Sequence, residues 1–531
     1  MDGSTTRPTA AGEVAWGTPA ARWMLTATVL GSGMAFLDST VVTVALPAIE
    51  DDLRTGLSGL QWIVNGYMVT LSALILLSGS LADRFGRVRL FIQGVVVFAL
   101  ASALCTFAPT LEWLVAGRIV QGVGGALLTP GSLAILQSGF RQQDRARAIG
   151  AWSGLTGVAS AVGPFVGGWL VQIGDWRLIF LINLPLAVIV SAIAWFKVPE
   201  SRDPGTAERR LDYPGALLGA VALGGTTYAL VQWGAVGATA AVRAGAVIGV
   251  LALVLFLVVE SRAAAPMLPL GMFSSRGFGA TNAATVLLYG ALGPLFFLLV
   301  IYLQEVADYP PVAAGAASLP ITVLMLVLSA RSGTLAARIG PRPQLIAGPL
   351  LVAAGLWSLS RVGPGAPYPT DVLPGVLLVA LGLSAAVAPL TATVLASAPE
   401  QHSGLASGVN NTFARGAQLI GVAAVPALAG IAGGGEGGGA VDAGSLATGF
   451  GPAMLILAGL CVVASLCALL LPRGRMAAAS EASARGSLPE AAAAAPSSGK
   501  GRPMRFCGVS GTPMRSCPGS SAGRPRDGAG G

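Results

Sequence analysis

Long apolar segments recur along almost the whole chain, and they constrain its fold more than any other feature. A bilayer core about 30 Å thick needs roughly 20 apolar residues in a helix, and fourteen segments bounded by charge, proline or polar clusters approach that length. They cover residues 24–47, 62–81, 90–108, 111–137, 148–171, 176–196, 213–233, 242–259, 278–303, 312–330, 345–359, 373–396, 405–431 and 447–471. Only 11% of the residues are charged, which excludes an ordinary soluble domain. The sequence predicts an all-α polytopic membrane protein with 14 transmembrane helices.

Basic residues in the loops predict the orientation of the chain, because Lys and Arg concentrate in cytoplasmic loops. The loops that follow the second, fourth, sixth, eighth and tenth segments hold most of them. The intervening loops hold only Arg54, Arg177, Arg243 and Arg361. This asymmetry predicts that both termini are cytoplasmic. It also attributes the net charge of +8 to topology, so no nucleic-acid partner is expected.

A short pattern occurs twice, after the second and after the tenth segment. The run from Gly79 to Gly86 and the run from Gly333 to Gly340 share Gly, Leu, Ala, Arg and Gly at the same offsets. Internal repeats of this kind are typical of transporters with duplicated halves. We therefore expect a cytoplasmic N-terminal tail (1–22), an N-terminal six-helix bundle (23–196), a cytoplasmic loop (197–212), two inserted transmembrane helices (213–260), a C-terminal six-helix bundle (277–471) and a disordered cytoplasmic tail (472–531).

Three ionisable side chains, Asp38, Arg118 and Arg415, fall inside apolar segments, where an unpaired charge costs at least about 2.5–3.5 kcal/mol. At 1.5 Å per residue, Asp38 lies roughly 13 Å and Arg118 roughly 10 Å from the external ends of their segments. Both therefore fall in one layer, with Asn65 and Tyr67 just above it. Two interpretations stay open: a static ion pair that fixes helix packing, or a carboxylate that takes up and releases a proton. Arg415 has no intramembrane acid of its own, and we expect it to contact backbone carbonyls or substrate.

Two further segments contain a candidate gate and a candidate bend. The loop after the second segment combines a turn, one acid and three arginines, so the acid can pair with arginines or cap a helix and hold one conformation shut. Its key residues are Gly79, Asp83, Arg84, Gly86 and Arg87. In the fifth segment a proline kinks the helix, and spaced glycines allow close helix approach. Those residues are Gly157, Gly163, Pro164, Gly167 and Gly168. The pattern alone leaves packing and gating equally open.

The sequence offers no sign of cofactor or metal chemistry. One histidine and five cysteines show no ligand spacing, and no Walker A pattern occurs in the chain. We expect no cofactor, no metal ion, no enzymatic activity and no direct use of ATP.

Taken together, the motifs resemble those of a known family. The run from Gly79 to Arg89 is similar to the cytoplasmic loop signature of the major facilitator superfamily, and the run from Leu37 to Pro47 looks like the first-span motif of its fourteen-span drug:proton antiporters. Two more runs resemble the fourth-span motif and the fifth-span antiporter motif of that branch. These are Arg118-Ile-Val-Gln121-Gly122 and the run from Gly157 to Gly168.

The resemblance implies a role for each motif. Asp38 and Arg118 would serve proton coupling, Asp83 with Arg84 and Arg87 the cytoplasmic gate, and Gly163-Pro164 the bend. Candidates for a polar layer or substrate contacts are Asn65, Tyr67, Gln121 and Arg415. The second loop copy has Ala337 in place of the acid, and the tenth segment has no carboxylate, which argues against dicationic substrates.

The function predicted from these features is proton-coupled antiport that exports small, largely apolar drugs or antibiotics across a bacterial cytoplasmic membrane. The expected partners are a small-molecule substrate, protons and the lipid bilayer, with the chain acting as a monomer. Two alternatives remain: export or symport of another metabolite, and a non-transporting membrane receptor. The excess of Arg over Lys, with abundant Ala and Gly, is typical of GC-rich bacteria. In such bacteria this family often provides self-resistance to antibiotic producers.

Overall fold

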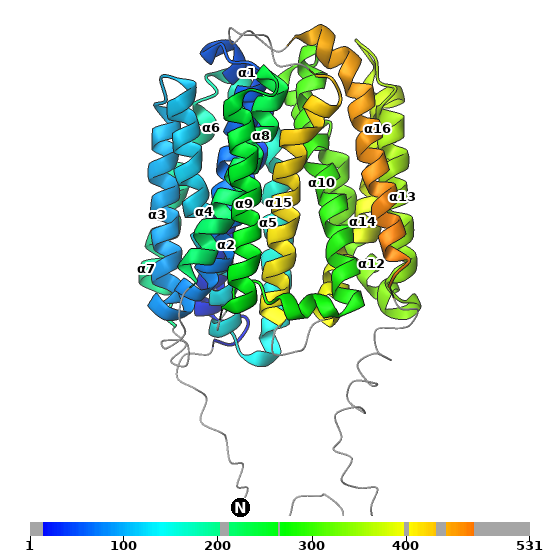
Figure 1. The fold of residues 1–531 in the computed structure, drawn as a ribbon. Coiled ribbons are helices and arrows are strands. Elements are labelled where there is room, and N and C mark those ends of the chain that lie inside the picture. The colour runs from blue at the N-terminus through cyan, green and yellow to red at the C-terminus, as the bar shows by residue number, and fades with distance from the viewer. Residues whose placement is uncertain (1–13, 202–211, 264–265, 398–402, 432–441, 472–531) are drawn as a thin grey trace, which may run out of the picture. The chain divides into compact units, whose positions relative to one another are not determined.

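The computed structural model describes residues 14–201, 212–263, 266–397, 403–431 and 442–471 (Figure 1). Regular structure in these ranges is helical, apart from one isolated bridge between Val14 and Phe140, which confirms the all-α prediction for them. The chain divides into two units, Met1–Ser480 and Glu481–Gly531. The predicted C-terminal tail, residues 1–13 of the predicted N-terminal tail and most of the loop at 197–212 lie outside the described residues.

Helices follow one another along the chain with short connections. The first half contains α1 (Pro19–Leu53), α2 (Leu57–Phe85), α3 (Arg87–Thr106), α4 (Leu111–Gly139), α5 (Gln142–Ile173), α6 (Leu178–Leu181) and α7 (Asn183–Lys197). Next come α8 (Tyr213–Val236), α9 (Ala240–Arg262) and the short turn η2 (Leu270–Ser274). The second half contains α10 (Arg276–Glu305), α11 (Pro311–Ala316), α12 (Leu319–Ile339), α13 (Arg342–Leu359), η3 (Tyr368–Val372), α14 (Leu373–Ala396), α15 (Ser403–Leu428) and α16 (Ala443–Ala468).

Twelve helices in the described ranges are long and apolar enough to cross a membrane. Two of these candidate spans, Leu178–Lys197 and Pro311–Ile339, each join two helices across a short break. The long helices α13 and α15 are not among the twelve, although the predicted eleventh and thirteenth segments fall on them. The physical reason is composition: α13 has 18 residues and begins with Arg342, and α15 includes Arg415 and several other polar residues. The count of fourteen spans therefore stays a prediction.

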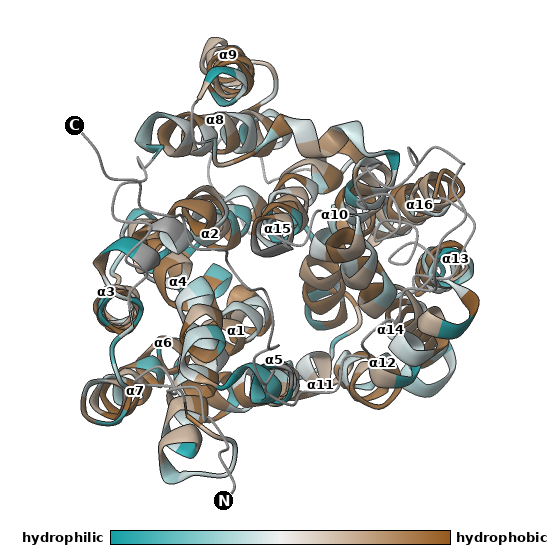
Figure 2. Cartoon of the chain, turned by 90° about the horizontal axis from the view of Figure 1, so that it is seen from below, coloured by the Kyte–Doolittle hydropathy of each residue, from teal (hydrophilic) through white to brown (hydrophobic). Residues whose placement is uncertain are grey.

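Helix packing brings the two halves of the chain together along a few specific pairs. In the first half α1 packs on α4, α5 and α7, and α4 packs on α2 and α3; in the second half α10 packs on α14, α15 and α16. Across the halves α5 contacts α11 and α12, α2 contacts α15, and α1 contacts α10. Figure 2 shows α8 lying against α2 and α15, with α9 outermost. The apolar side chains of α9 are largely exposed, as expected for a lipid-facing helix.

The repeated loop pattern has the same backbone feature in both copies. Gly86 ends α2 with φ of +108°, and Gly340 ends α12 with φ of +87°. Glycine adopts this left-handed region without the steric cost of a side chain. The shared final glycine of the pattern therefore forms the turn into the next helix in each half.

Candidate functional site

Asp38 lies at the centre of a fully buried polar network. Its Oδ2 accepts a hydrogen bond from Arg118 Nη1 at 2.5 Å, which is also an ion pair. Its Oδ1 accepts from Gln121 Nε2 at 2.7 Å and from Asn183 Nδ2 at 2.9 Å. All four side chains are buried. One carboxylate on α1 thus joins α1 to α4, through Arg118 and Gln121, and to α7, through Asn183.

The Arg118 guanidinium has further partners inside the protein. Nη1 also donates to Gln121 Oε1 at 2.6 Å, and Nε donates to the backbone carbonyl of Ile63 on α2 at 3.1 Å. The guanidinium lies over the ring of Tyr67, 4.5 Å from its centroid, a cation–π contact that strengthens when water is excluded. Arg118 is therefore held by α1, α2 and its own helix.

Sequence reasoning missed two members of this network, Ser102 and Asn183. Ser102 Oγ on α3 accepts from Gln121 Nε2 at 3.0 Å and from Asn183 Nδ2 at 3.3 Å. Asn183 interrupts an otherwise apolar run, and an amide in such a run was a signal that could have been used. Serine carries no comparable signal, because it is common in transmembrane helices and can bond to its own helix, as Ser102 does to Phe98.

A second arginine inside the bundle lies in the other half of the chain. Arg415 on α15 is partly buried, and its guanidinium lies 5.9 Å from the ring centroid of Phe36. Tyr67 and Tyr289 lie within electrostatic range of its charge. Asn65 is fully buried, and neither atom of its amide has a partner among the described residues. Tyr67 therefore has Arg118 over its ring and Arg415 within electrostatic range.

The candidate gate is organised by a residue that the sequence did not indicate. Glu200, after α7, accepts hydrogen bonds from the backbone N–H groups of Val88 and Arg89, both at 3.0 Å. These donors belong to the first turn of α3, whose N-cap position is occupied by Gly86. Because glycine has no side chain to cap the helix, Glu200 supplies the acceptor from a distant part of the chain. A Cβ at Gly86 would lie 2.9 Å from the Glu200 carboxyl carbon, so a side chain there would displace the cap.

The other gate residues have simpler surroundings. The backbone N–H of Arg87 donates to Ser201 O at 3.2 Å, and the Arg84 guanidinium lies 5.6 Å from the ring centroid of Phe85. Gly79 is within α2, and a Cβ added there would meet nothing within 4 Å. The side chain of Asp83 is outside what the structure describes.

Removing the Glu200 cap should loosen the start of α3. We expect Glu200→Ala to speed amide hydrogen exchange at Val88 and Arg89 roughly fivefold, because a lost cap leaves helix N–H groups without an acceptor. Glu200→Gln keeps one acceptor oxygen and should have a smaller effect. Hydrogen exchange with mass spectrometry on the full-length protein in detergent measures both variants. Unchanged exchange in Glu200→Ala would contradict the capping role.

Glycines of the fifth segment lie on the contact faces of α5. A Cβ at Gly163 would clash with Thr40, and one at Gly167 would lie 2.9 Å from Val41 Cγ1, both on α1. A Cβ at Gly168 would lie 2.6 Å from Val312 Cα on α11. Pro164 lies inside α5 between these contacts, whereas a Cβ added at Gly157 would meet nothing within 4 Å. The motif therefore packs α5 against both halves of the chain, except at Gly157.

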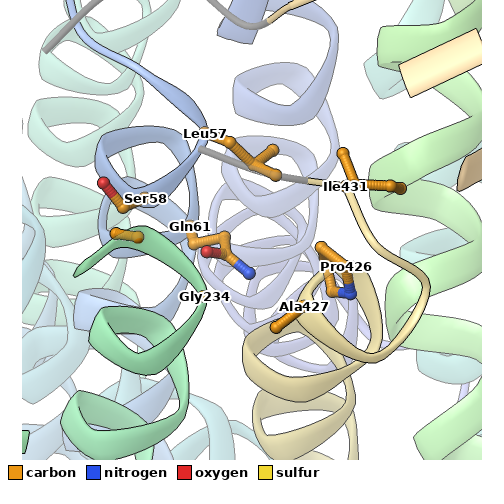
Figure 3. Close-up of a pocket in the computed structure, with 8 residues that line it drawn as sticks. Leu57, Ser58, Gln61, Gly234, Pro426, Ala427 and Ile431 are labelled. Atoms are coloured by element: carbon orange, nitrogen blue, oxygen red, sulfur yellow. The ribbon is translucent and has the colours of Figure 1, made fainter. Parts of the chain in front are cut away.

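At the end of the bundle where α1 reaches Leu53, here termed the Leu53 end, two glutamines connect the halves. Gln61 Nε2 on α2 donates to Val422 O on α15 at 2.7 Å. Pro426 cannot donate to that carbonyl four residues earlier, so Gln61 supplies the missing donor. Gln304 Nε2 on α10 likewise donates to Val44 O on α1 at 3.1 Å. Figure 3 shows Gln61 and Pro426 lining a small pocket between α2, α8 and α15.

The described residues thus combine twelve candidate membrane spans with an ion pair that is buried between helices. Residues 28–422 match the family model of the Major Facilitator Superfamily, and the chain belongs to that superfamily. It is therefore a multi-pass protein of a cell membrane. The predicted superfamily is confirmed, while the fourteen-span branch stays a prediction.

Curated relatives cover most of the chain. It is 36% identical over 406 residues to the methylenomycin A resistance protein of Bacillus subtilis, covering 74% of this chain and 84% of that protein. It is 35% identical over 411 residues to the tetracenomycin C resistance and export protein of Streptomyces glaucescens, covering 76% and 75%. Among solved structures, a bacterial homologue of the human lysosomal transporter Spinster, in an inward-facing and unoccupied conformation, matches with a TM-score of 0.61. That match has 17% identity and covers 86% of this chain and 97% of that one, so it shows the shared fold.

Proposed function

We propose that this protein is a drug efflux transporter that exports antibiotics or related small molecules from a bacterial cell. The support comes from relatives at 33–36% identity, whose names describe antibiotic resistance, multidrug resistance or export. Export is favoured over uptake symport by the same names and by the fifth-segment motif. A non-transporting receptor has no supporting feature in the described residues.

We infer that export is driven by protons and that Asp38 carries the proton. The observation that supports this role is the network itself: both oxygens of the Asp38 carboxylate act only as acceptors, for donors on two other helices. A proton on Oδ1 would occupy one of the two positions that accept from Gln121 and Asn183, and a proton on Oδ2 would remove the charge that attracts Arg118, so at least one of these bonds is weakened. Protonation would then loosen α1 from α4 or α7. This sensitivity to protonation is required of a proton carrier, whereas an ion pair that only fixes helix packing does not need it.

The proposed arrangement in the membrane has fourteen spans, with α8 and α9 inserted between two six-helix bundles and both termini in the cytoplasm. The Leu53 end is then external, and the loop from Gly79 to Arg89 is a cytoplasmic gate in which Asp83 acts with Arg84 and Arg87. Contacts of α13 with α14 and α16, and of α15 with α2, α8 and α10, support their inclusion as spans. The chain is proposed to act as a monomer.

A protonophore should stop export if the proton gradient drives it. In cells that express the protein, a fluorescent drug should accumulate on protonophore addition while cellular ATP is held constant. Cells without the protein provide the baseline for passive entry. Efflux that continues at its original rate under these conditions would contradict proton coupling, because the gradient supplies the only driving force in the proposal.

A further inference from the structure

Arg415 differs from Arg118 in what its guanidinium contacts. Arg118 has a carboxylate, a side-chain amide and a backbone carbonyl as acceptors. Arg415 has a buried Nε without a hydrogen-bond partner among the described residues, and Tyr67 and Tyr289 lie within electrostatic range of its charge. No carboxylate pairs with it among the described residues. A guanidinium offers five donors and stays charged. A partly buried guanidinium without a carboxylate partner therefore favours binding of an anionic ligand that accepts its hydrogen bonds.

The surroundings of Arg415 come from both halves of the chain. Phe36 belongs to α1, Tyr67 to α2, and Tyr289 to α10, while Arg415 itself is on α15. These helices contact one another in pairs, α1 with α10, α2 with α15 and α10 with α15, and Figure 2 shows them grouped in the middle of the assembly. Helices of both halves thus contribute the aromatic side chains around an arginine that has no carboxylate partner among the described residues.

We propose that Arg415, Phe36, Tyr67 and Tyr289 form a substrate subsite for an aromatic or other planar molecule that bears a carboxylate. The guanidinium binds the two carboxylate oxygens in its fork geometry, and the partly exposed rings of Phe36 and Tyr289 pack on the planar part of the molecule. This inference rests on the proposed export function and specifies its substrate class. It differs from the sequence-based expectation of largely apolar substrates.

Tyr67 gives this subsite a physical link to the proton site. Its ring lies beneath the Arg118 guanidinium, and Arg415 lies within electrostatic range of it. A substrate carboxylate on Arg415 would place a negative charge close to Tyr67. A shift of Tyr67 would in turn change the contact with Arg118, the partner of Asp38. Binding in one half is thereby connected to the ion pair in the other.

Equilibrium binding of two matched dyes tests the subsite. The probes are 7-diethylaminocoumarin-3-carboxylate and its neutral ethyl ester, and the readout is fluorescence anisotropy with full-length protein in detergent. The wild-type protein should bind the carboxylate more tightly than the ester. Arg415→Gln should weaken binding of the carboxylate roughly tenfold or more, as expected for loss of a charged hydrogen-bond partner, and change binding of the ester less than twofold.

Two further variants complete the test. Arg415→Lys keeps the charge without the planar fork, so the preference for the carboxylate should survive at lower affinity. Arg361→Gln is the control, because Arg361 is exposed and lies over the ring of Trp357; both affinities should stay unchanged. Equal wild-type affinity for the two probes, or an equal loss of both in Arg415→Gln, would overturn the proposal. If Arg415→Gln fails to fold, the Arg415→Lys variant decides the test: loss of its preference for the carboxylate over the ester would also overturn the proposal.

The binding measurement uses no ion gradient, so it is independent of proton coupling. A protein that prefers the carboxylate but exports drugs in the presence of a protonophore would keep the subsite and lose the proposed coupling. A protein with proton-driven export and no preference for the carboxylate would keep the proposed function and lose the subsite. The two failures are therefore distinguishable.

Discussion

Asp38→Asn is expected to reduce proton-driven export to the level of membranes without the protein. An amide of nearly the same shape can fill the site between Arg118, Gln121 and Asn183, but it cannot take up and release a proton. Reconstituted vesicles with an imposed pH gradient measure the driven reaction. Exchange of labelled for unlabelled drug without a gradient measures the conformational cycle alone, and this exchange should persist if Asp38 serves only as the proton carrier.

The variant also removes the counter-charge of a buried arginine, which typically costs about 3–5 kcal/mol of stability. Arg118→Gln combined with Asp38→Asn makes both positions neutral and should recover much of that loss. The double variant therefore separates the two interpretations of the ion pair. If the pair only holds helices together, the double variant regains gradient-driven export; if Asp38 carries the proton, it regains folding and exchange but not driven export. A double-mutant cycle in which the stability effects simply add would refute the interaction.

The sequence predicted the depth of the site in the membrane correctly, but it identified only some of the residues that form the site. Counting residues from segment ends gave similar depths for Asp38 and Arg118, and the structure joins them in an ion pair. Depth along a helix is fixed by its rise per residue, but the side of the helix that a residue presents to its neighbours depends on tertiary packing. Asn183 and Ser102 contact the network from α7 and α3, and no local pattern specifies which faces of those helices turn inward.

Long-range backbone contacts were equally inaccessible from local sequence. Glu200 caps α3 from more than a hundred residues away, whereas the pattern around Gly79 to Gly86 suggested that the local acid Asp83 had that kind of role. The break between α6 and α7 could not be predicted from local sequence either, because it lies at Ile182, an apolar residue. Helix content and order follow from apolar length and proline placement, which are local. Helix caps, helix breaks and hydrogen bonds between the halves depend on tertiary packing, which local sequence does not determine.

A single methyl group added at Gly168 is expected to have a large effect on transport. In Gly168→Ala the new carbon would lie 2.6 Å from Val312 Cα and 2.7 Å from Pro311 O, both backbone atoms of α11 that cannot move aside as a flexible side chain would. We expect α5 and α11 to be forced apart, so that the Leu53 end no longer closes and export falls at least about tenfold, a loss typical of misplaced packing in a working site. Gly315→Ala, on the α11 side of the same contact, should act alike because its added carbon would clash with Pro164 O.

Gly157→Ala is the matched control on the same helix. Both substitutions raise the helix propensity of α5 by a similar amount, about 1 kcal/mol, but a carbon at Gly157 meets nothing within 4 Å. Transport by Gly157→Ala should therefore stay near wild type, while Gly168→Ala loses it. The distance between spin labels at Ile173 on α5 and Asp371 in η3, both exposed, reports separation at the Leu53 end and should increase only in Gly168→Ala. Equal transport and equal label distances in the two variants would mean that the contact between α5 and α11 does not take part in closing that end. The glycines of the fifth segment would then be needed for packing on α1 alone.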